Sequence, residues 1–418
     1  MWRVLNSKMS TTLEIILGIT VLIAVSLAVG RLAKLVHLPN VTAYLVAGLL
    51  IGPSCLRFLS HETIESFSII TTIALGFIAF SIGGEFKIQN IKRIGGKVIT
   101  ITFFQALTTV FFVDASLLLL AVFGLTTPAE AIVLGAIATA TAPAATLMVV
   151  KQYKAKGPVT EALLPVVALD DAIGLMVFAI SNSIAMAIHS DAGISVKTIL
   201  IDPLLEIVIS LAVGCVIGVL LAVVVRFFHS RSNKLCLMIV SVFAGVGASI
   251  AFDELLGIPL SSLLVCMMIG AAFCNLKDDA VSIMEGSERW TPPLFLLFFA
   301  ISGAELNLAT VVSVGVVGVV YLATRSAGKW FGAFLGATIT KADPNIRKYL
   351  GVALLPQAGV AIGMSQIVAA TFPDIAGTVT TVVLCATLIY ELFGPVLTKI
   401  ALQKAGEIAK PEKKKKAA

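Results

Sequence analysis

The sequence predicts an all-α membrane protein whose chain crosses the lipid bilayer about thirteen times. Hydrophobic residues make up 58% of the 418 residues, charged residues only 13%, and the mean hydropathy is +1.02. A soluble domain, by contrast, carries roughly 25% charged residues. The apolar runs are also much longer than the ~10 residues of a transmembrane β-strand, and lipid admits only helices or closed barrels. A polytopic helical bundle is therefore expected.

The candidate spans are apolar runs bounded by charged or turn-forming residues. In chain order they cover residues 13–30, 41–56, 67–83, 98–124, 129–150, 162–188, 199–225, 235–252, 257–275, 293–306, 309–338, 348–372 and 375–398. The first run lacks a small-residue cleavage site after it, so we interpret it as a retained helix.

Charge alternates between the connections that join these spans, and every second connection is basic. The basic connections and the C-terminal tail contain Arg31, Lys34, Lys87, Lys92, Arg93, Lys97, Lys151, Lys154, Lys156, Arg226, Arg231, Lys234, Lys277, Arg289, Lys341, Arg347, Lys348, Lys399, Lys404, Lys410 and Lys413 to Lys416. By the positive-inside rule these segments are cytoplasmic, which predicts a multi-pass protein of the cell membrane with its C-terminus inside and its N-terminus outside. Arg3 and Lys8 run against that placement of the N-terminus.

Several other classes of protein are excluded by what the sequence contains. The net charge of +6 comes from basic residues in the connections and the tail, where the positive-inside rule accounts for them, so no nucleic-acid partner is expected. The six cysteines are scattered singly without metal-ligand spacing, and there is no phosphate loop, nucleophile elbow or paired His and Cys. We therefore expect neither an enzyme nor a bound cofactor. The longest polar connection, Asn275 to Thr291, is too short to fold alone. Residues 1–402 form the membrane domain, and 403–418 a basic, solvated cytoplasmic tail.

Two spans contain residues that interrupt a helix near its middle. The fifth holds Thr139-Ala-Thr-Ala-Pro-Ala-Ala-Thr146, and the twelfth holds Pro356-Gln-Ala-Gly-Val-Ala-Ile-Gly363. Proline removes a backbone hydrogen bond, so both segments are expected to unwind at membrane depth. Matching breaks in two halves of a chain point to a transporter substrate site. Spans four to six and eleven to thirteen would then form an inverted repeat with crossing broken helices.

An aspartate pair lies inside the otherwise apolar run from Ala162 to Ile188. One carboxylate at membrane depth costs roughly 2.5–3.5 kcal/mol even on a lenient insertion scale, so a purely structural role for Asp170 and Asp171 is disfavoured. At 1.5 Å per residue, Asp171 and Lys329 reach the same depth from the basic side. Lys329 would pair with one carboxylate and leave the other for a cation, which must compete with protons.

Each of these interpretations has a structural alternative. The aspartates could anchor neighbouring helices, and Lys329 could extend its ammonium group to the interface. Arg325, one turn from Lys329, is interpreted as a structural residue that binds carbonyls or a carboxylate, with Asp114 and Glu391 both left open as partners. The hydroxyls of Thr139, Thr141 and Thr146 could serve helix packing. Gln357 could cap backbone exposed by the second break.

These motifs together resemble the monovalent cation/proton antiporter-2 family. The resemblance is carried by Ala168-Leu-Asp-Asp-Ala-Ile-Gly174, by Arg325-Ser-Ala-Gly-Lys329, by the run around Pro143 and by Leu354 to Gly363, and it covers nearly the whole membrane chain. It implies that Asp171 binds the cation or protons and that Asp170 pairs with Lys329. It also implies a homodimer, in which a core of about residues 98–188 and 309–398 moves against a dimerising scaffold. The sequence departs from a related pattern at one position. Ala142 stands where members of the first family of such cation/proton antiporters carry an aspartate.

The function expected from these residues is secondary active transport. The protein would exchange a monovalent cation, Na⁺ first with Li⁺ or K⁺ as alternatives, for protons by alternating access, as in pH homeostasis. Asp171 and Asp170 would hold Na⁺ together with Thr141, supported by Thr139, Thr146, Pro143, Gln357 and Arg325. Release of a proton from Lys329 would make exchange electrogenic. The alternatives are a potassium efflux component, an organic-anion symporter and a membrane sensor with the same fold.

Overall fold

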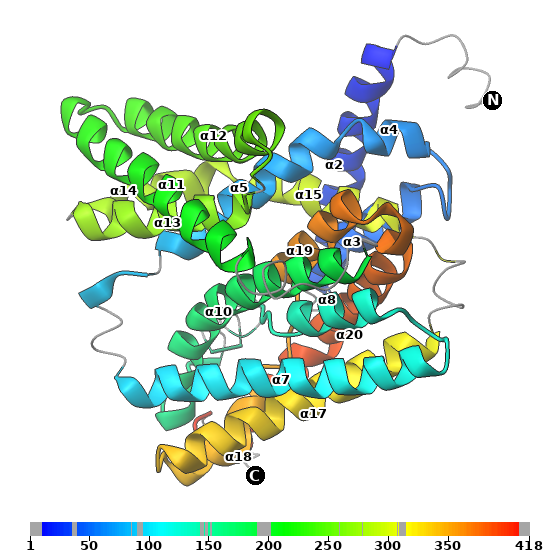
Figure 1. The fold of residues 1–418 in the computed structure, drawn as a ribbon, viewed down its shortest axis with the longest axis vertical. Helices are drawn as coiled ribbons and strands as arrows, with labels where there is room; N and C mark the ends of the chain where they lie inside the picture. The colour runs from blue at the N-terminus through cyan, green and yellow to red at the C-terminus, as the bar shows by residue number, and fades with distance from the viewer. Residues whose placement is uncertain are drawn as a thin grey trace, which may run out of the picture.

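The computed structural model describes residues 11–35, 40–84, 86–89, 95–142, 146, 149–150, 153–189, 202–258, 260–277, 279–306, 308 and 315–408. Within these ranges every regular secondary-structure element is a helix (Figure 1). The helices are α2 (Thr11–Leu35), α3 (Asn40–Ile51), α4 (His61–Glu65), α5 (Ser68–Gly84), α7 (Gly96–Val122), α8 (Pro128–Ile137), α10 (Pro158–His189), α11 (Asp202–Val224), η2 (Val225–Phe227), α12 (Arg231–Leu256), α13 (Ser262–Leu276), α14 (Ala280–Trp290), α15 (Pro292–Glu305), α17 (Gly315–Ile339), α18 (Pro344–Ala353), α19 (Gly359–Thr371) and α20 (Pro373–Lys404).

The all-α prediction is confirmed, and each predicted span overlaps at least one described helix. Seven of the described helices are long and apolar enough to cross a membrane, and α3, α8, α13, α15 and α19 are shorter apolar helices. The predicted breaks are present as well. The fifth span leaves the helix after Ile137, and the twelfth is divided into α18 and α19 by Leu354 to Ala358. Pro143, to which the first break was attributed, lies outside the described residues.

The first halves of the two broken spans begin in similar ways. Thr127 caps α8 by accepting from the Glu130 amide at 3.2 Å, and the Glu130 carboxylate accepts from the Thr127 amide at 2.7 Å. Asp343 caps α18 by accepting from the Asn345 amide at 2.8 Å. Each cap is followed by a proline, which fits the first turn because its missing N–H has no helical partner there.

Two groups of helices can be distinguished by their packing. One consists of α2, α3, α4, α5 and α11 to α15, and the other, which we call the core group, consists of α7, α8, α10 and α17 to α20. The most extensive contact in the molecule is between α7 and α17, which run side by side at the edge of the core group (Figure 1). Both aspartates, both breaks and Lys329 belong to the core group.

Glycines on one face of α17 permit its close approach to α7. A methyl group at Gly328, Gly332 or Gly336 would lie 2.6 to 2.8 Å from the Cα atoms of Thr109, Gln105 and Ile101, which is too close for a real side chain. Small residues at every fourth position allow helix backbones to touch within a membrane. The stripe places Lys329, the neighbour of Gly328, beside α7.

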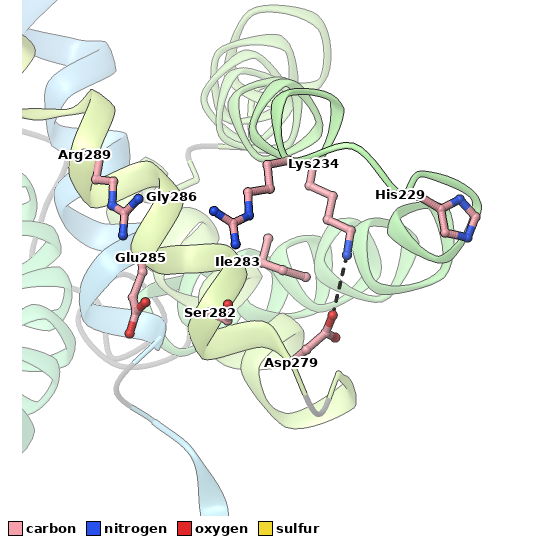
Figure 2. A pocket seen from close by; sticks show the side chains of 9 residues that line it. His229, Lys234, Asp279, Ser282, Ile283, Glu285, Gly286 and Arg289 are labelled. Atoms are coloured by element: carbon pink, nitrogen blue, oxygen red, sulfur yellow. Dashed lines mark ion pairs between the residues drawn. The ribbon is translucent and has the colours of Figure 1, made fainter.

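Two polar segments contain structure that their composition did not reveal. The polar connection from Asn275 to Thr291 contains α14, whose Ile283 and Met284 are buried while charged residues occupy its other face. Figure 2 shows this helix beside a cavity of about 270 Å³, where Lys234 on α12 forms a 3.5 Å ion pair with Asp279. A composition that is polar on average concealed the amphipathic period of α14.

The second segment is the start of the tail, which was predicted to be solvated from residue 403. The helix α20 continues to Lys404, and Glu407 and Ile408 are buried. The Glu407 carboxylate accepts hydrogen bonds from the amides of Val159 at 2.6 Å and Thr160 at 2.8 Å. Residues 409–418 lie outside the described ranges.

Candidate functional site at the crossing of two broken helices

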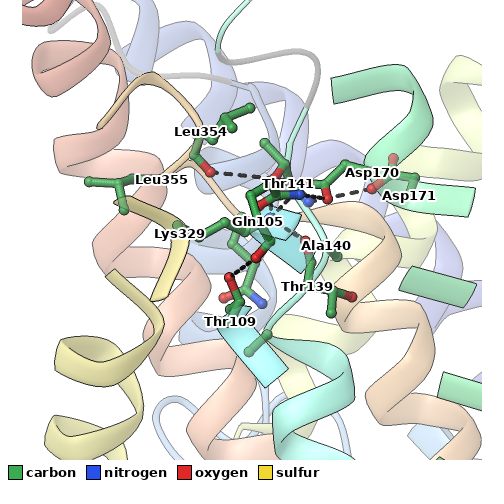
Figure 3. A network of polar contacts seen from close by, with 12 residues as sticks. Gln105, Thr109, Thr139, Ala140, Thr141, Asp170, Asp171, Lys329, Leu354 and Leu355 are labelled. Carbon is green, nitrogen blue, oxygen red and sulfur yellow. Dashed lines mark hydrogen bonds and ion pairs between the residues drawn. The ribbon is translucent and has the colours of Figure 1, made fainter. Parts of the chain in front are cut away.

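The two breaks are in direct contact. The amide of Ala142, in the first break, donates a 2.8 Å hydrogen bond to the carbonyl of Pro356, in the second. An unwound segment leaves backbone donors and acceptors that lipid cannot satisfy, so they must find partners within the protein. The crossing therefore gathers polar backbone around one point in the middle of the core group (Figure 3).

Asp170 is the centre of the polar network shown in Figure 3. Its carboxylate forms a 2.5 Å ion pair with Lys329 and accepts further hydrogen bonds from Gln105 Nε2 and Thr141 Oγ1. The carboxylate and the ammonium group are both fully buried. A buried ion pair is tolerable only when additional hydrogen bonds satisfy the remaining oxygens and protons. Here the additional donors come from α7 and from the first break.

Lys329 also bonds to the backbone that the first break exposes. Its ammonium group donates to the Thr139 carbonyl and, at 2.8 Å, to the Thr141 hydroxyl. Three acceptors are thus arranged around one ammonium group, which has three protons to donate. The positive charge of Lys329 is held by the unwound segment as well as by Asp170.

Asp171 follows directly in α10 and is buried with 2% exposure. Its Oδ1 lies 3.4 Å from the amide nitrogen of Thr141, which is longer than an ordinary N–H···O bond. The two adjacent carboxylates therefore approach the same threonine by different routes. Asp170 contacts the hydroxyl group, and Asp171 faces the backbone amide.

Arg325 joins the two breaks. Its Nε, Nη2 and Nη1 nitrogens donate to the carbonyls of Ala138 at 2.9 Å, Ala140 at 2.7 Å and Leu355 at 2.7 Å. The guanidinium group also lies 4.4 Å from the centre of the Tyr390 ring. These contacts are with carbonyls of both breaks, whereas Asp114 and Glu391, the carboxylates considered as partners, are not among them. A rigid planar fork suits this task better than a lysine would.

The remaining predicted residues have supporting contacts. Gln357 donates to the carbonyl of Ile137 at 3.1 Å and to the hydroxyl of Tyr321 at 2.9 Å, so it caps the end of α8. The Thr139 hydroxyl donates to Ala136 O at 2.6 Å. The Thr146 hydroxyl bonds to Ala142 O at 3.4 Å. Pro143 lies outside the described residues.

The structure thus brings Asp170, Asp171, Thr141 and Lys329 together. Thr139 joins them through its carbonyl, which accepts from Lys329, and not through its hydroxyl. Sequence reasoning missed Gln105, a fully buried residue of α7 that bonds Asp170. The sequence could have indicated Gln105, because it is a polar side chain in the middle of an apolar span. Burying a polar group in the membrane costs free energy, which is the argument that selected the aspartates.

Comparison with known proteins identifies the family. The family model described as "Sodium/hydrogen exchanger, transmembrane" matches residues 18–404. The chain belongs to the sodium/hydrogen exchanger family. Its function is the exchange of a cation for protons across a membrane, as membership of this family indicates. No curated protein matches this exchanger by sequence.

Solved structures show the same fold. The sodium proton antiporter MjNhaP1 from Methanocaldococcus jannaschii at pH 8 aligns with a TM-score of 0.77 at 17% identity, over 94% of this chain and 100% of that chain. A structure of MjNhaP1 from an electron-microscopy map aligns with a TM-score of 0.72 at 18% identity, over 95% of this chain and 99% of that chain. The exchanger therefore has the fold of a sodium proton antiporter.

Proposed function

We propose that this exchanger carries a monovalent cation, Na⁺ in the first place, and that Asp171 is the group that binds either the cation or a proton. The observation that supports this assignment is the 2.5 Å ion pair between Asp170 and Lys329. Asp170 and Lys329 neutralise each other, so Asp171 carries the remaining negative charge of these three groups. One monovalent cation or one proton on Asp171 neutralises the group at membrane depth, and this makes the two ions competitors.

The first break supplies the surroundings of the bound cation. Thr141 touches both aspartates, and its hydroxyl already serves Asp170 and Lys329. A hard monovalent cation takes oxygen ligands, which carboxylates and unwound carbonyls provide. The negative charge of Asp170 would help to attract the cation while Asp170 stays paired with Lys329. Arg325 and Gln357 act as positioning residues, because they bind the backbone that the two breaks expose.

Lys329 determines the charge moved in one cycle. If the arriving cation draws Asp170 away and Lys329 releases its proton, two protons exchange for one cation and transport is electrogenic. If Lys329 keeps its proton, exchange is electroneutral. The two additional acceptors on Lys329 support the ammonium form, which favours the electroneutral cycle. A transport rate that depends on a clamped membrane potential, measured in proteoliposomes, would reject the electroneutral cycle.

Alternating access follows from the division into two helix groups. The core group carries the whole site, so its displacement against α2 to α5 and α11 to α15 would expose Asp171 to one side and then the other. We place the basic connections and the C-terminus on the cytoplasmic side of the cell membrane. The second helix group is the proposed dimer interface of a homodimer.

Ion flux measurements test this function directly. Purified protein in proteoliposomes should dissipate an imposed pH gradient when Na⁺ is added, with Li⁺ and K⁺ tested separately. Asp171→Asn removes the titrating charge and should abolish the flux, while the protein still purifies as a folded species. Equal flux in the wild type and in this variant would reject Asp171 as the shared site. A response to K⁺ with none to Na⁺ would select the potassium alternative.

A further inference from the structure

A second cavity lies between the two helix groups, away from the aspartate pair. It is an open cavity of about 710 Å³, lined by α4, α5, the beginning of α13 and the end of α15 on one side and by α19 and the beginning of α20 on the other. By the charge of the connections, all of these helix ends face the outside of the cell. The cavity is thus situated where ions would enter or leave on that side.

The charged residues in the lining of the cavity are acidic. Of the described residues that form it, Glu65 and Glu305 are carboxylates and His61 is the remaining titratable group, while none is a lysine or arginine. Glu305 ends α15 and accepts a hydrogen bond from Gln366 of α19, so it lies at the contact between the two groups. A negative lining with no basic residue attracts cations and repels anions.

Thr71 supplies an independent indication of a ligand. It lines the cavity from α5, is only 6% exposed, and its hydroxyl oxygen has no hydrogen-bond partner among the described residues. Such hydroxyls normally bond to the carbonyl one turn earlier, as Thr72 bonds to Ser68 at 3.0 Å. Thr71 therefore brings a hydroxyl oxygen without a hydrogen-bond partner in the described part of the chain to the same cavity that Glu305 lines.

We infer that this cavity binds a hydrated monovalent cation between Glu305 and Thr71, as a waiting site for the transported ion on the outer side. The inference rests on the proposed function and adds a second, peripheral site to it. Leu75 also lines the cavity, and its Cδ2 lies 2.4 Å from where a Cβ on Gly363 of α19 would be.

The test combines sidedness with direct detection of the ion. In right-side-out vesicles, Glu305→Gln should raise the KM for external Na⁺ about fivefold or more, since a carboxylate contact of about 1 kcal/mol is lost. The maximal rate should stay within about twofold, and the KM in everted vesicles should not change, because chemistry at Asp171 is untouched. Glu62→Gln, which removes an exposed charge of α4 that does not line the cavity, is the matched control and should behave as the wild type.

Thallium provides the second readout, as a heavy substitute for a monovalent cation. Crystals of the full-length protein soaked in Tl⁺ should show an anomalous peak between Glu305 and Thr71, and the peak should disappear in Glu305→Gln. Absence of the peak in the wild type, its persistence in the variant, or an unchanged external KM would each overturn the inference. The proposed function fails separately, through loss of Na⁺-driven flux in the wild type, whatever Tl⁺ shows in this cavity.

Discussion

Glu407 is bonded to Thr160 at the beginning of the helix that carries both aspartates. Its carboxylate accepts from the Thr160 amide at 2.8 Å and from the Thr160 hydroxyl at 2.7 Å, and from the neighbouring Val159 amide at 2.6 Å. The first amides of a helix lack partners within it, and a negative charge there is favourable. The end of the described chain therefore caps α10.

Removal of this cap should destabilise the protein. Glu407→Ala leaves buried amides without their acceptor, and hydrogen bonds to a charged group contribute roughly 1.5–3 kcal/mol each. We expect a lower unfolding temperature in detergent and reduced flux. Glu161→Gln removes an exposed charge from the same turn and should cost less. Equal unfolding temperatures for the two variants would contradict the capping role.

The close packing of α17 on α7 predicts a steric effect at Gly332. Gly332→Ala would place a methyl group 2.6 Å from the Cα of Gln105, where only the backbone can yield, and overpacking typically costs about 1–3 kcal/mol. Because Gln105 bonds Asp170, flux should fall together with thermal stability. Gly318→Ala, on the same helix with no atom within 4 Å of the added methyl, should be neutral or slightly stabilising. If both variants behave alike, the helix contact is not as close as described.

Arg325 should not be replaceable by lysine. Arg325→Lys keeps the charge but offers one nitrogen where three now reach the carbonyls of both breaks, and each lost bond to a charged donor is worth roughly 1.5–3 kcal/mol. We expect loss of most transport activity in proteoliposomes. Arg347→Lys, which disturbs a single 3.2 Å bond to Ala342, should retain activity. Full activity of the Arg325 variant would show that the clamp is dispensable.

The ion pair of Asp170 and Lys329 predicts a rescue by double substitution. Asp170→Asn leaves a buried ammonium group without its carboxylate, and breaking such a pair costs about 3–5 kcal/mol. Adding Lys329→Gln removes the unpaired charge and should recover much of the unfolding temperature, although not necessarily the transport. A double variant as unstable as the single one would mean that the pair is not energetically coupled.

The sequence allowed prediction of features that depend on local chemistry. Prolines and glycines placed the two breaks, and the cost of charge in lipid selected Asp170, Asp171 and Lys329 without knowledge of the fold. Contacts between distant segments were not accessible in this way. Gln105 meets Asp170 across 65 positions and Glu407 meets Thr160 across 247, and no local pattern records such pairs. For Arg325 the sequence left carbonyls and two carboxylates open as partners, because the carbonyls of Ala138, Ala140 and Leu355 come together only once both breaks are folded.

The hydrogen bond from Ala142 to Pro356 has a consequence for how the transporter works. Together with the guanidinium clamp, it ties the two breaks into one cage. If this cage moves as one unit in the proposed transport cycle, the proposed ligands of the ion keep the same arrangement whichever side they face. A difference in ion affinity between the two sides would then arise in the passages that lead to the cage, and changes in those passages would adapt the exchanger to a saltier or more acidic habitat.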